Sequence, residues 1–146
     1  MTDGSRVPPY DILERTITYS LQTIHFCRGL ENDPVNRILS RQLLRSATSV
    51  GANVHEAQGG QSRADFISKM SIAHKEAREA AYWLRLLREE RIGNQETLNS
   101  LIDETRQLVK ILASIILNTK EQTVQYASTA SSKAAKVLEG YPFLLS

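Results

Sequence analysis

Residues 62–87 read SRADFISKMSIAHKEAREAAYWLRLL, and this stretch decides the fold. Its apolar residues recur at alternating steps of four and three: Phe66, Met70, Ala73, Ala77, Ala80, Leu84 and Leu87. Seven residues make almost two turns of an α-helix, so these side chains share one face. A heptad stripe of this kind is typical of a helix that packs at about 20° against a partner helix. Ser62, with Asp65 three residues later, is a suitable N-terminal cap. The stretch therefore predicts one long helix of a helical bundle.

Three further helices are predicted, over residues 10–30, 34–58 and 95–118. Asn32 or Asp33 caps the second of them and Pro34 begins it, while the pair Gly59–Gly60 ends it. Gly93 is expected to end the helix described above. The main apolar stripes are Leu13, Ile17, Leu21 and Ile24, then Leu43, Ala47, Val50, Val54 and Ala57, and then Leu98, Ile102, Thr105, Val109, Leu112 and Ile116. Gly51 lies inside the second helix, where it lets another helix approach closely.

Four helices joined by short turns predict an all-α protein, an antiparallel up-down-up-down four-helix bundle over residues 10–119. Residues 1–9 are expected to form a disordered leader. Residues 120–146 are rich in Ser, Thr and Ala, and we expect a flexible tail with an apolar end from Tyr141 to Leu145. A chain of 146 residues with 41% hydrophobic side chains is enough for one such domain.

The sequence offers no constellation for catalysis. Cys27 is the only cysteine, which excludes an internal disulfide and a multi-cysteine metal site. His25, His55 and His74 fall on three different predicted helices, and no Glu is followed three residues later by a His, as a di-iron bundle requires. We therefore expect a non-enzymatic protein with no catalytic residue, metal or cofactor. The segment from Gly59 to Arg63 precedes a helix start and could attract an anion, but a glycine pair that ends a helix accounts for it as well.

Localisation follows from two absences in the sequence. No apolar run reaches the roughly 18 residues of a membrane span, and the first nine residues lack the apolar centre of a signal peptide. A single free cysteine also fits a reducing compartment. We expect a cytoplasmic protein that does not associate with a membrane.

The charge balance permits nucleic acid as a partner without requiring one, since the formal net charge is +2. The candidate phosphate contacts are Arg41, Arg45, Arg63, Lys69, Lys75, Arg78 and Arg85. The alternative is a solvated surface of ion pairs, in which Arg45 faces Glu76 and Glu79.

A polar stripe runs beside the apolar one on the second helix: Gln42, Ser46, Ser49, Asn53 and Glu56. Buried polar groups without partners cost several kcal/mol, so these side chains need hydrogen bonds. They form either a network that fixes helix register or a surface for nucleic acid or another subunit.

Additional apolar residues exceed what one core stripe requires, above all on the fourth helix and in the stripe of Ile12, Tyr19 and Phe26. Wide apolar faces favour contacts between subunits. The predicted oligomer interface consists of Tyr19, Phe26, Trp83, Leu86, Leu101 and Leu108, with Ile12 and Ile115 beside them.

Residues 42–57, QLLRSATSVGANVHEA, resemble the signature of the four-helix bundle family named after the 23S rRNA intervening sequence. The similarity continues through Ser62, Arg63, Asp65, Phe66, Ile67, Ile72 and Ala73, and it spans about residues 10–119. The matched motif positions are Gln42, Arg45, Ser49, Asn53, Glu56, Ser62 and Phe66, and none has an implied catalytic role. The chain departs from the pattern at Gly51, where the family has Pro, at Ala57, where it has Gly, and in the loop 58–61, which lacks the usual positive charge.

The resemblance implies a bundle that assembles into a ring, with five copies, and a role in binding RNA. A related branch comprises the accessory proteins of diversity-generating retroelements, which bind a reverse transcriptase and nucleic acid. Two hypotheses follow. The first is a homo-oligomeric protein associated with RNA or DNA, with RNA preferred. The second is a protein-interaction scaffold or accessory subunit, with the apolar end of the tail as one docking element.

Overall fold

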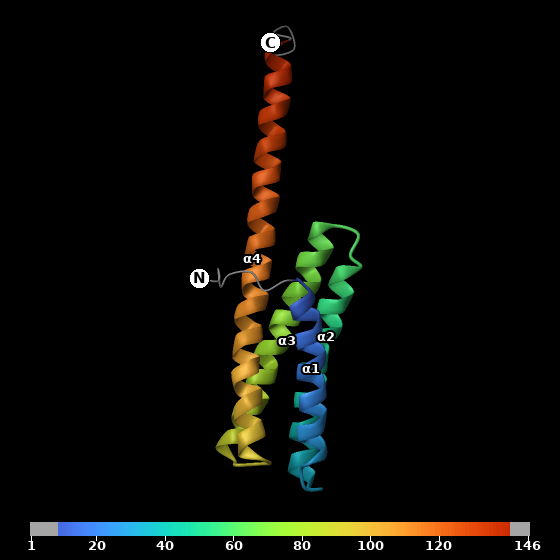
Figure 1. The fold of residues 1–146 in the computed structure, drawn as a ribbon, viewed down its shortest axis with the longest axis vertical. Coiled ribbons are helices and arrows are strands. Elements are labelled where there is room, and N and C mark those ends of the chain that lie inside the picture. Colours follow the sequence, from blue (N-terminus) through green and yellow to red (C-terminus); the bar gives the residue numbers. More distant parts are fainter. Residues whose placement is uncertain (1–8, 141–146) are drawn as a thin grey trace.

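The computed structural model describes residues 9–140, and this part of the chain is all-helical, as predicted (Figure 1). It contains four helices: α1 (Pro9–Arg28), α2 (Pro34–Gln58), α3 (Arg63–Glu89) and α4 (Gln95–Glu139). The colours of Figure 1 show the chain running down α1, up α2, down α3 and up α4. The predicted leader, apart from Pro9, and the apolar segment from Tyr141 to Leu145 lie outside the described residues.

The helix ends follow the capping residues that the sequence supplies. Asp33 caps α2, and its carboxylate accepts hydrogen bonds from the backbone N–H groups of Val35 and Asn36. Ser62 caps α3 by accepting from the backbone N–H of Asp65. Each cap satisfies donors that the first turn of a helix leaves without partners. The predicted starts of α2 and α3 are therefore confirmed.

The core lies where the stripes of α2 and α3 face each other, as the heptad pattern predicts. All five predicted core residues of α2 are buried, and so are Met70 to Leu87 of the α3 stripe, while Phe66 at its start is half-buried. Four alanines of α2 and α3 (Ala47, Ala73, Ala77 and Ala80) are wholly inaccessible to solvent. Small side chains at these positions allow close approach of the two backbones.

Helix α1 faces the core with a stripe other than the predicted main one. Ile17 and Leu21 are 41% and 52% exposed, whereas Tyr19 and Phe26 are buried. The buried stripe is Ile12, Thr16, Tyr19, Thr23 and Phe26. Its two threonines donate hydrogen bonds to carbonyl groups of their own helix, Leu13 and Tyr19 respectively. Because these hydroxyls are satisfied locally, the stripe is buried at little cost despite its polar members.

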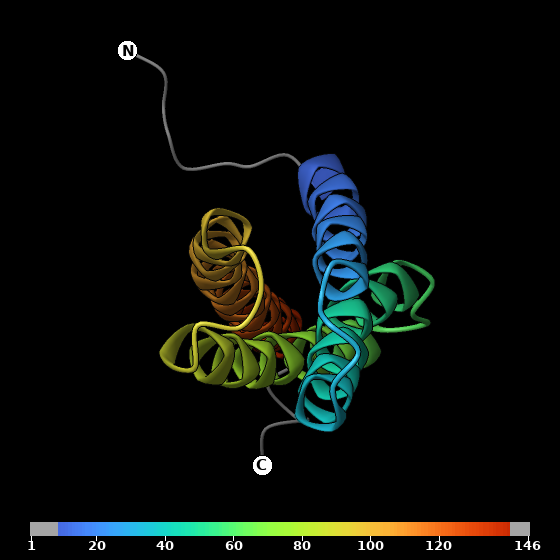
Figure 2. The same cartoon turned by 90° about the horizontal axis from the view of Figure 1, so that it is seen from below.

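Helices α1 and α2 approach each other closely at Gly51. A Cβ atom at this position would lie 3.2 Å from Thr16 Cβ and 3.4 Å from the Thr16 carbonyl oxygen. The prediction that Gly51 admits a neighbouring helix is therefore confirmed. Figure 2, seen from below, shows α1 beside α2 and α4 beside α3, with α1 and α4 farther apart. The bundle is consequently more open along its α1–α4 side.

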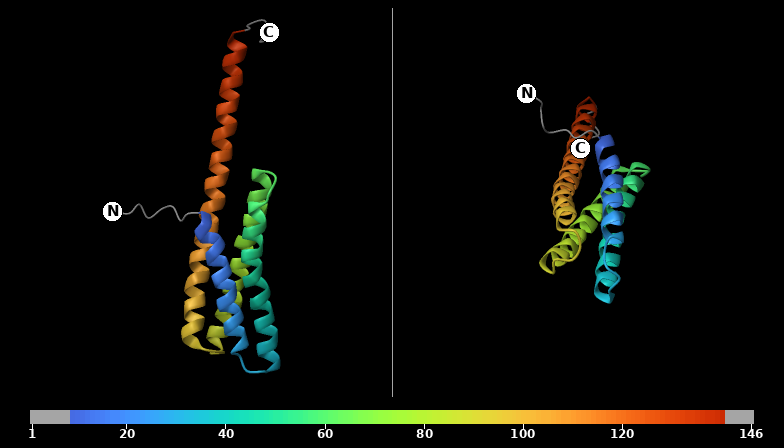
Figure 3. Two further views of the ribbon diagram at one scale, coloured as in Figure 1. Left: turned by 45° about the vertical axis from the view of Figure 1, so that its right-hand side comes forward. Right: turned by 60° about the horizontal axis from the view of Figure 1, so that its bottom comes forward.

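Helix α4 is longer than predicted, because it continues past Asn118 to Glu139 without a break. No Gly or Pro occurs between Gln95 and Glu139, and the added residues include many good helix formers. Every residue from Lys120 to Val137 is exposed, so this half of the helix packs on little else. Figure 3 shows it extending well beyond the other three helices. The sequence predicts a flexible tail from residue 120, whereas in the structure the helix continues to Glu139.

Candidate nucleic-acid interface

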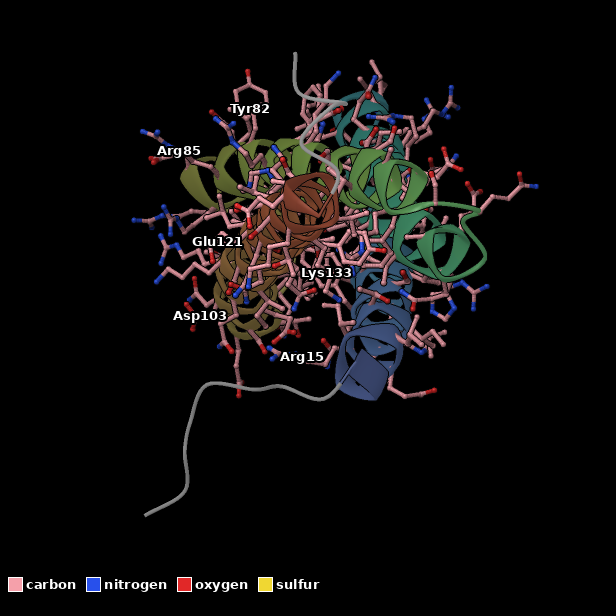
Figure 4. All side chains as sticks on the ribbon, turned by 90° about the horizontal axis from the view of Figure 1, so that it is seen from above. Arg15, Tyr82, Arg85, Asp103, Glu121 and Lys133 are labelled. Carbon is pink, nitrogen blue, oxygen red and sulfur yellow. The ribbon has the colours of Figure 1, made fainter. Side chains whose placement is uncertain are left out.

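The outer face of α3 carries a row of cations around one aromatic ring. Lys75, Arg78, Tyr82 and Arg85 follow one another at steps of three, four and three, and all four are exposed. This spacing places them on one face of the helix, over about 15 Å of its length. Tyr82 is 57% exposed, and its ring meets that of Trp83 edge-on at 5.0 Å between centroids. Tyr82 and Arg85 project outward on the side away from α1 (Figure 4). We call these four residues the α3 stripe.

Arg45, by contrast, is held by carboxylates of α3. Its guanidinium pairs with Glu79 and donates to Glu76 Oε1 at 3.4 Å. Glu79 also accepts a hydrogen bond of 3.2 Å from the indole of Trp83. The bond with Glu79 raises the pKa of Arg45, and the bonds from Arg45 and Trp83 lower the pKa of Glu79. The expected contact of Arg45 with Glu76 and Glu79 is therefore present in the structure.

The remaining predicted cations are dispersed. Lys69, near the start of α3, forms an ion pair of 2.8 Å with Glu56, near the end of α2. Arg63 lies over the ring of Tyr126 of α4, at 5.8 Å from the ring centroid, a cation–π arrangement. Arg41 is exposed on α2. The structure therefore gathers only Lys75, Arg78 and Arg85 of the seven candidates on one helix face.

The side chains of the polar stripe form most of their hydrogen bonds within α2 itself. Ser46 is buried and donates to the carbonyl groups of Gln42 and Leu43 at 3.0 Å. Asn53 donates to the carbonyl of Ser49 at 2.8 Å, and only Glu56 reaches across to another helix. These bonds stabilise the stripe without making it a network between helices.

Four residues of the predicted oligomer interface are in the core of this chain. Tyr19, Phe26, Leu101 and Leu108 are between 0% and 4% exposed, so the prediction is corrected for them. The bundle buries Leu101 and Leu108 of α4 beside Leu98, Leu112 and Ile116 of the main stripe. The other two members, Trp83 and Leu86, are half-buried.

Exposed apolar side chains remain on every helix, and on α1 they include two residues of the predicted main apolar stripe. Exposed Ile17 and Leu21 line a shallow groove of about 360 Å³ together with Gly51, Ala52 and His55. Val35 and Ile38 of α2 are also exposed, at 55% and 64%. We call Ile17, Leu21 and the groove beside them the α1–α2 apolar groove.

The open side between α1 and α4 is polar. Arg15 donates to both carboxylate oxygens of Glu104 at 3.0 Å and also contacts Gln107. Tyr19 lies beside this pair, and burial raises its pKa to about 12. Farther along α1, on the side of α2, burial raises the pKa of the half-buried Cys27 thiol to about 11. Both groups are held in their neutral forms, and no activating base contacts either one among the described residues.

No group of three or more His, Cys, Asp or Glu side chains in residues 9–140 is placed to hold a metal ion. No helix in this range is sufficiently long and apolar to cross a membrane.

Comparison with known proteins places the chain in a family. The family model described as 23S rRNA-intervening sequence protein matches residues 9–114. A similar solved structure is the 1.70 Å crystal structure of a protein with unknown function from the S23 ribosomal protein family of Bacteroides thetaiotaomicron VPI-5482. The two chains are 40% identical, with a TM-score of 0.66, over 72% of this chain and 97% of the other. No match was found among curated proteins. The chain therefore belongs to the family of 23S rRNA-intervening sequence proteins.

Proposed function

We propose that this protein is a non-enzymatic, homo-oligomeric bundle of the cytoplasm that binds nucleic acid, with RNA preferred, through the α3 stripe. The observation that carries the proposal is the placement of an exposed aromatic ring between cations. Lys75 and Arg78 precede Tyr82 by seven and four residues on the same helix face, and Arg85 follows by three.

This arrangement suits a flexible strand better than a duplex. Cations at this spacing can contact successive phosphates, while the exposed ring of Tyr82 offers a base a surface on which to stack. Single-stranded RNA presents both groups, because its bases are not occupied in a helix. The ring of Tyr82 meets the indole of Trp83 in a T-shaped contact, and that indole donates a hydrogen bond to Glu79. The ring is therefore restrained before a ligand arrives, which lowers the entropic cost of binding.

Fluorescence anisotropy with labelled single-stranded RNA at two salt concentrations tests the proposal. The wild-type protein should bind, and its affinity should fall steeply as salt rises. Replacing Lys75 and Arg78 together by Gln should lower the slope of log affinity against log salt by about 1.4, because each lost contact removes roughly 0.7. Tyr82→Leu should weaken binding by about fivefold or more with little change in that slope.

Matched controls separate a specific surface from general charge. Arg37→Gln removes an exposed cation at the start of α2, and Tyr126→Leu removes an exposed aromatic ring of α4. Each control should change the affinity by less than twofold. A wild-type protein that shows no salt-dependent binding, or controls that match the α3 variants, would contradict the proposal.

A second candidate function is a protein-interaction scaffold, and the α1–α2 apolar groove favours it. Apolar side chains such as Leu21, at 52% exposure, are commonly covered in an assembly. The occupant proposed here is a second copy, and the resemblance implies five copies in a ring. A reverse transcriptase or another mobile-element protein is the heterologous partner that the same resemblance suggests.

Light scattering distinguishes the assembly from a monomer. Wild type should have a mass that is a multiple of 16.4 kDa, and Leu21→Glu should reduce it, because burying an unpaired carboxylate in an apolar contact is costly. Glu14→Gln, which alters an exposed α1 residue outside the groove, serves as control. A wild-type mass of one chain would rule out the oligomer and leave the binding of nucleic acid to be judged on its own.

A further inference from the structure

A small pocket between α3 and α4 is lined by three arginines. Its walls are Arg85 and Arg88 of α3 and Arg106 of α4, and its floor is formed by Ala81 and Ile102. The volume is about 200 Å³, below the range of about 300–1,000 Å³ that holds drug-sized ligands. A single small anionic group fits such a space better than a metabolite.

The guanidinium groups at this pocket are not committed to other partners. Arg85 Nε lies 3.7 Å from Glu89 and Arg106 Nη1 lies 3.9 Å from Asp103, each a neighbour on its own helix. Both distances exceed the roughly 2.7–3.2 Å of a hydrogen bond, so the N–H donors remain available. Arg88 makes no side-chain ion pair within residues 9–140. In this respect the three differ from Arg45 and Arg15, which are fully engaged by carboxylates.

The pocket is continuous with the α3 stripe, because Arg85 belongs to both. Tyr82 lies three residues before Arg85, and Arg88 lies three residues after it. Figure 4 shows Arg85 of α3 and Asp103 of α4 projecting on the same side of the molecule, where these two helices adjoin. A strand whose base stacks on Tyr82 would therefore bring a neighbouring phosphate to the three arginines.

We infer that the pocket of Arg85, Arg88 and Arg106 binds a phosphate group of the nucleic acid. The inference rests on the proposed function and adds α4 to the binding surface. A guanidinium presents its N–H donors in a planar, forked arrangement that matches two phosphate oxygens. Three guanidinium groups that line one pocket can therefore surround a phosphate. The apolar floor strengthens these charged hydrogen bonds by excluding water from one side.

The test measures binding of single-stranded RNA of about 20 nucleotides, longer than the site of one typical module, to variants outside the original stripe. Arg88→Gln and Arg106→Gln should each weaken binding by about tenfold, as expected for a lost charged hydrogen bond, and each should lower the salt slope by about 0.7. Arg106→Lys should recover only part of the affinity, because it restores the charge without the fork. Arg37→Gln is the control of equal charge change, and thermal melting should show all four variants to be as stable as wild type.

Each outcome has a distinct meaning. If wild type binds RNA and the pocket variants lose no more affinity than Arg37→Gln, the phosphate pocket is refuted while the proposed function stands. If wild type does not bind RNA, both are refuted. If Arg106→Lys binds as well as wild type, the pocket supplies only charge, and the inference of a phosphate-shaped site fails.

Two versions of the RNA identify which phosphate the pocket holds. With a 5′-phosphorylated strand and a 5′-hydroxyl strand of the same sequence, an effect of Arg106→Gln confined to the phosphorylated strand assigns a terminal phosphate. Equal effects on both strands assign a phosphate of the backbone. Either result supports the pocket.

Discussion

The hydroxyl groups of Tyr19 and Thr105 form a buried hydrogen bond between α1 and α4, with 2.6 Å between the two oxygen atoms. Thr105 donates its only hydroxyl proton to the carbonyl of Leu101. Tyr19 must therefore be the donor and Thr105 the acceptor. The bond joins the two helices on the more open side of the bundle.

Losing the acceptor of this hydrogen bond, Thr105, should lower the free energy of unfolding more than losing the donor, Tyr19. Tyr19→Phe removes one hydrogen bond and should lower the free energy of unfolding by about 1 kcal/mol. Thr105→Val leaves the buried Tyr19 hydroxyl without a partner and should cost about 2 kcal/mol. Urea unfolding of both variants and of the double variant measures this order. Equal costs for the two single variants would contradict the assigned direction of the bond.

The raised pKa of Tyr19 predicts a loss of stability in alkali. Burial raises this pKa from 10.0 to about 12, so between these values the folded state holds a proton that the unfolded state has released. The stabilising contribution is complete below pH 10 and should fall by about 1.4 kcal/mol per pH unit up to the folded pKa. Cys27 also titrates in this region, so the measurement compares wild type with Tyr19→Phe. The stability difference between the two should change from pH 9 to pH 11, and an unchanged difference would refute the assignment.

Gly51 sets the distance between α1 and α2. Alanine usually stabilises a helix by about 1 kcal/mol relative to glycine, but a Cβ here would meet Thr16 at 3.2 Å. Gly51→Ala should therefore give no gain, and Gly51→Leu should cost about 2 kcal/mol or more from overpacking. Ala52→Leu on the adjacent exposed position should change stability by less than about 0.5 kcal/mol. Thermal unfolding compares the three variants, and a stabilised Gly51→Leu protein would overturn the close contact.

Arg45 should matter for stability and not for nucleic-acid binding. One oxygen of Glu76, Oε2, is buried and accepts no hydrogen bond among the described residues, although Arg45 Nη1 lies 3.3 Å away. Arg45→Gln should cost about 1 kcal/mol, because a partly exposed cluster is screened by solvent. The pKa of Glu79 is lowered by Arg45, so the contribution is present at neutral pH and is lost as the pH falls through that pKa. Unfolding at pH 7 and at acidic pH, with RNA affinity measured alongside, checks both parts. A large loss of affinity with unchanged stability would reverse the assignment.

The projecting half of α4 should be dispensable for folding. Residues 121–137 are exposed throughout, and Tyr126 of this segment contacts Arg63 of α3 in a cation–π arrangement. Ending the chain after Lys120 should lower the free energy of unfolding by less than about 1 kcal/mol, the value of one exposed cation–π contact. Circular dichroism should show reduced helix content with nearly the same melting temperature. A fall in melting temperature of many degrees would show that the segment packs on the bundle.

The sequence predicts α2 and α3 well because their stripes consist of apolar residues alone, from Leu43 to Ala57 and from Met70 to Leu87. Helix α1 is predicted correctly, but its core-facing stripe is not, because hydrophobicity favours Ile17 and Leu21 over Thr16 and Thr23. Only the structure shows that both threonines satisfy their hydroxyls within the helix. The extension of α4 was missed because its residues lack an apolar stripe, although they contain no helix breaker.

The candidate site was predicted in part. Helical spacing predicts that Lys75, Arg78 and Arg85 share one helix face. The positive charge alone, however, makes Arg45 and Lys69 equally good candidates for phosphate contacts. Their carboxylate partners come from other helices and depend on tertiary contacts. Tyr82 was missed as a binding residue, although its position between Arg78 and Arg85 was a readable signal. Arg106 could not be linked to α3 from the sequence, because it lies 18 positions beyond Arg88 and reaches the pocket only through the packing of α3 on α4.

The exposed half of α4 also fixes how far the end of this helix lies from the bundle. From Tyr126, which contacts Arg63, to Glu139 the helix advances about 20 Å at 1.5 Å per residue. A helical spacer holds whatever follows Glu139 at a defined distance and direction, whereas a flexible chain of the same length would spread it through a volume. The rigid helix therefore fixes one site, at Glu139, relative to the contact between Tyr126 and Arg63. Lengthening the spacer by one heptad would move that site by about 10 Å while keeping its orientation nearly unchanged.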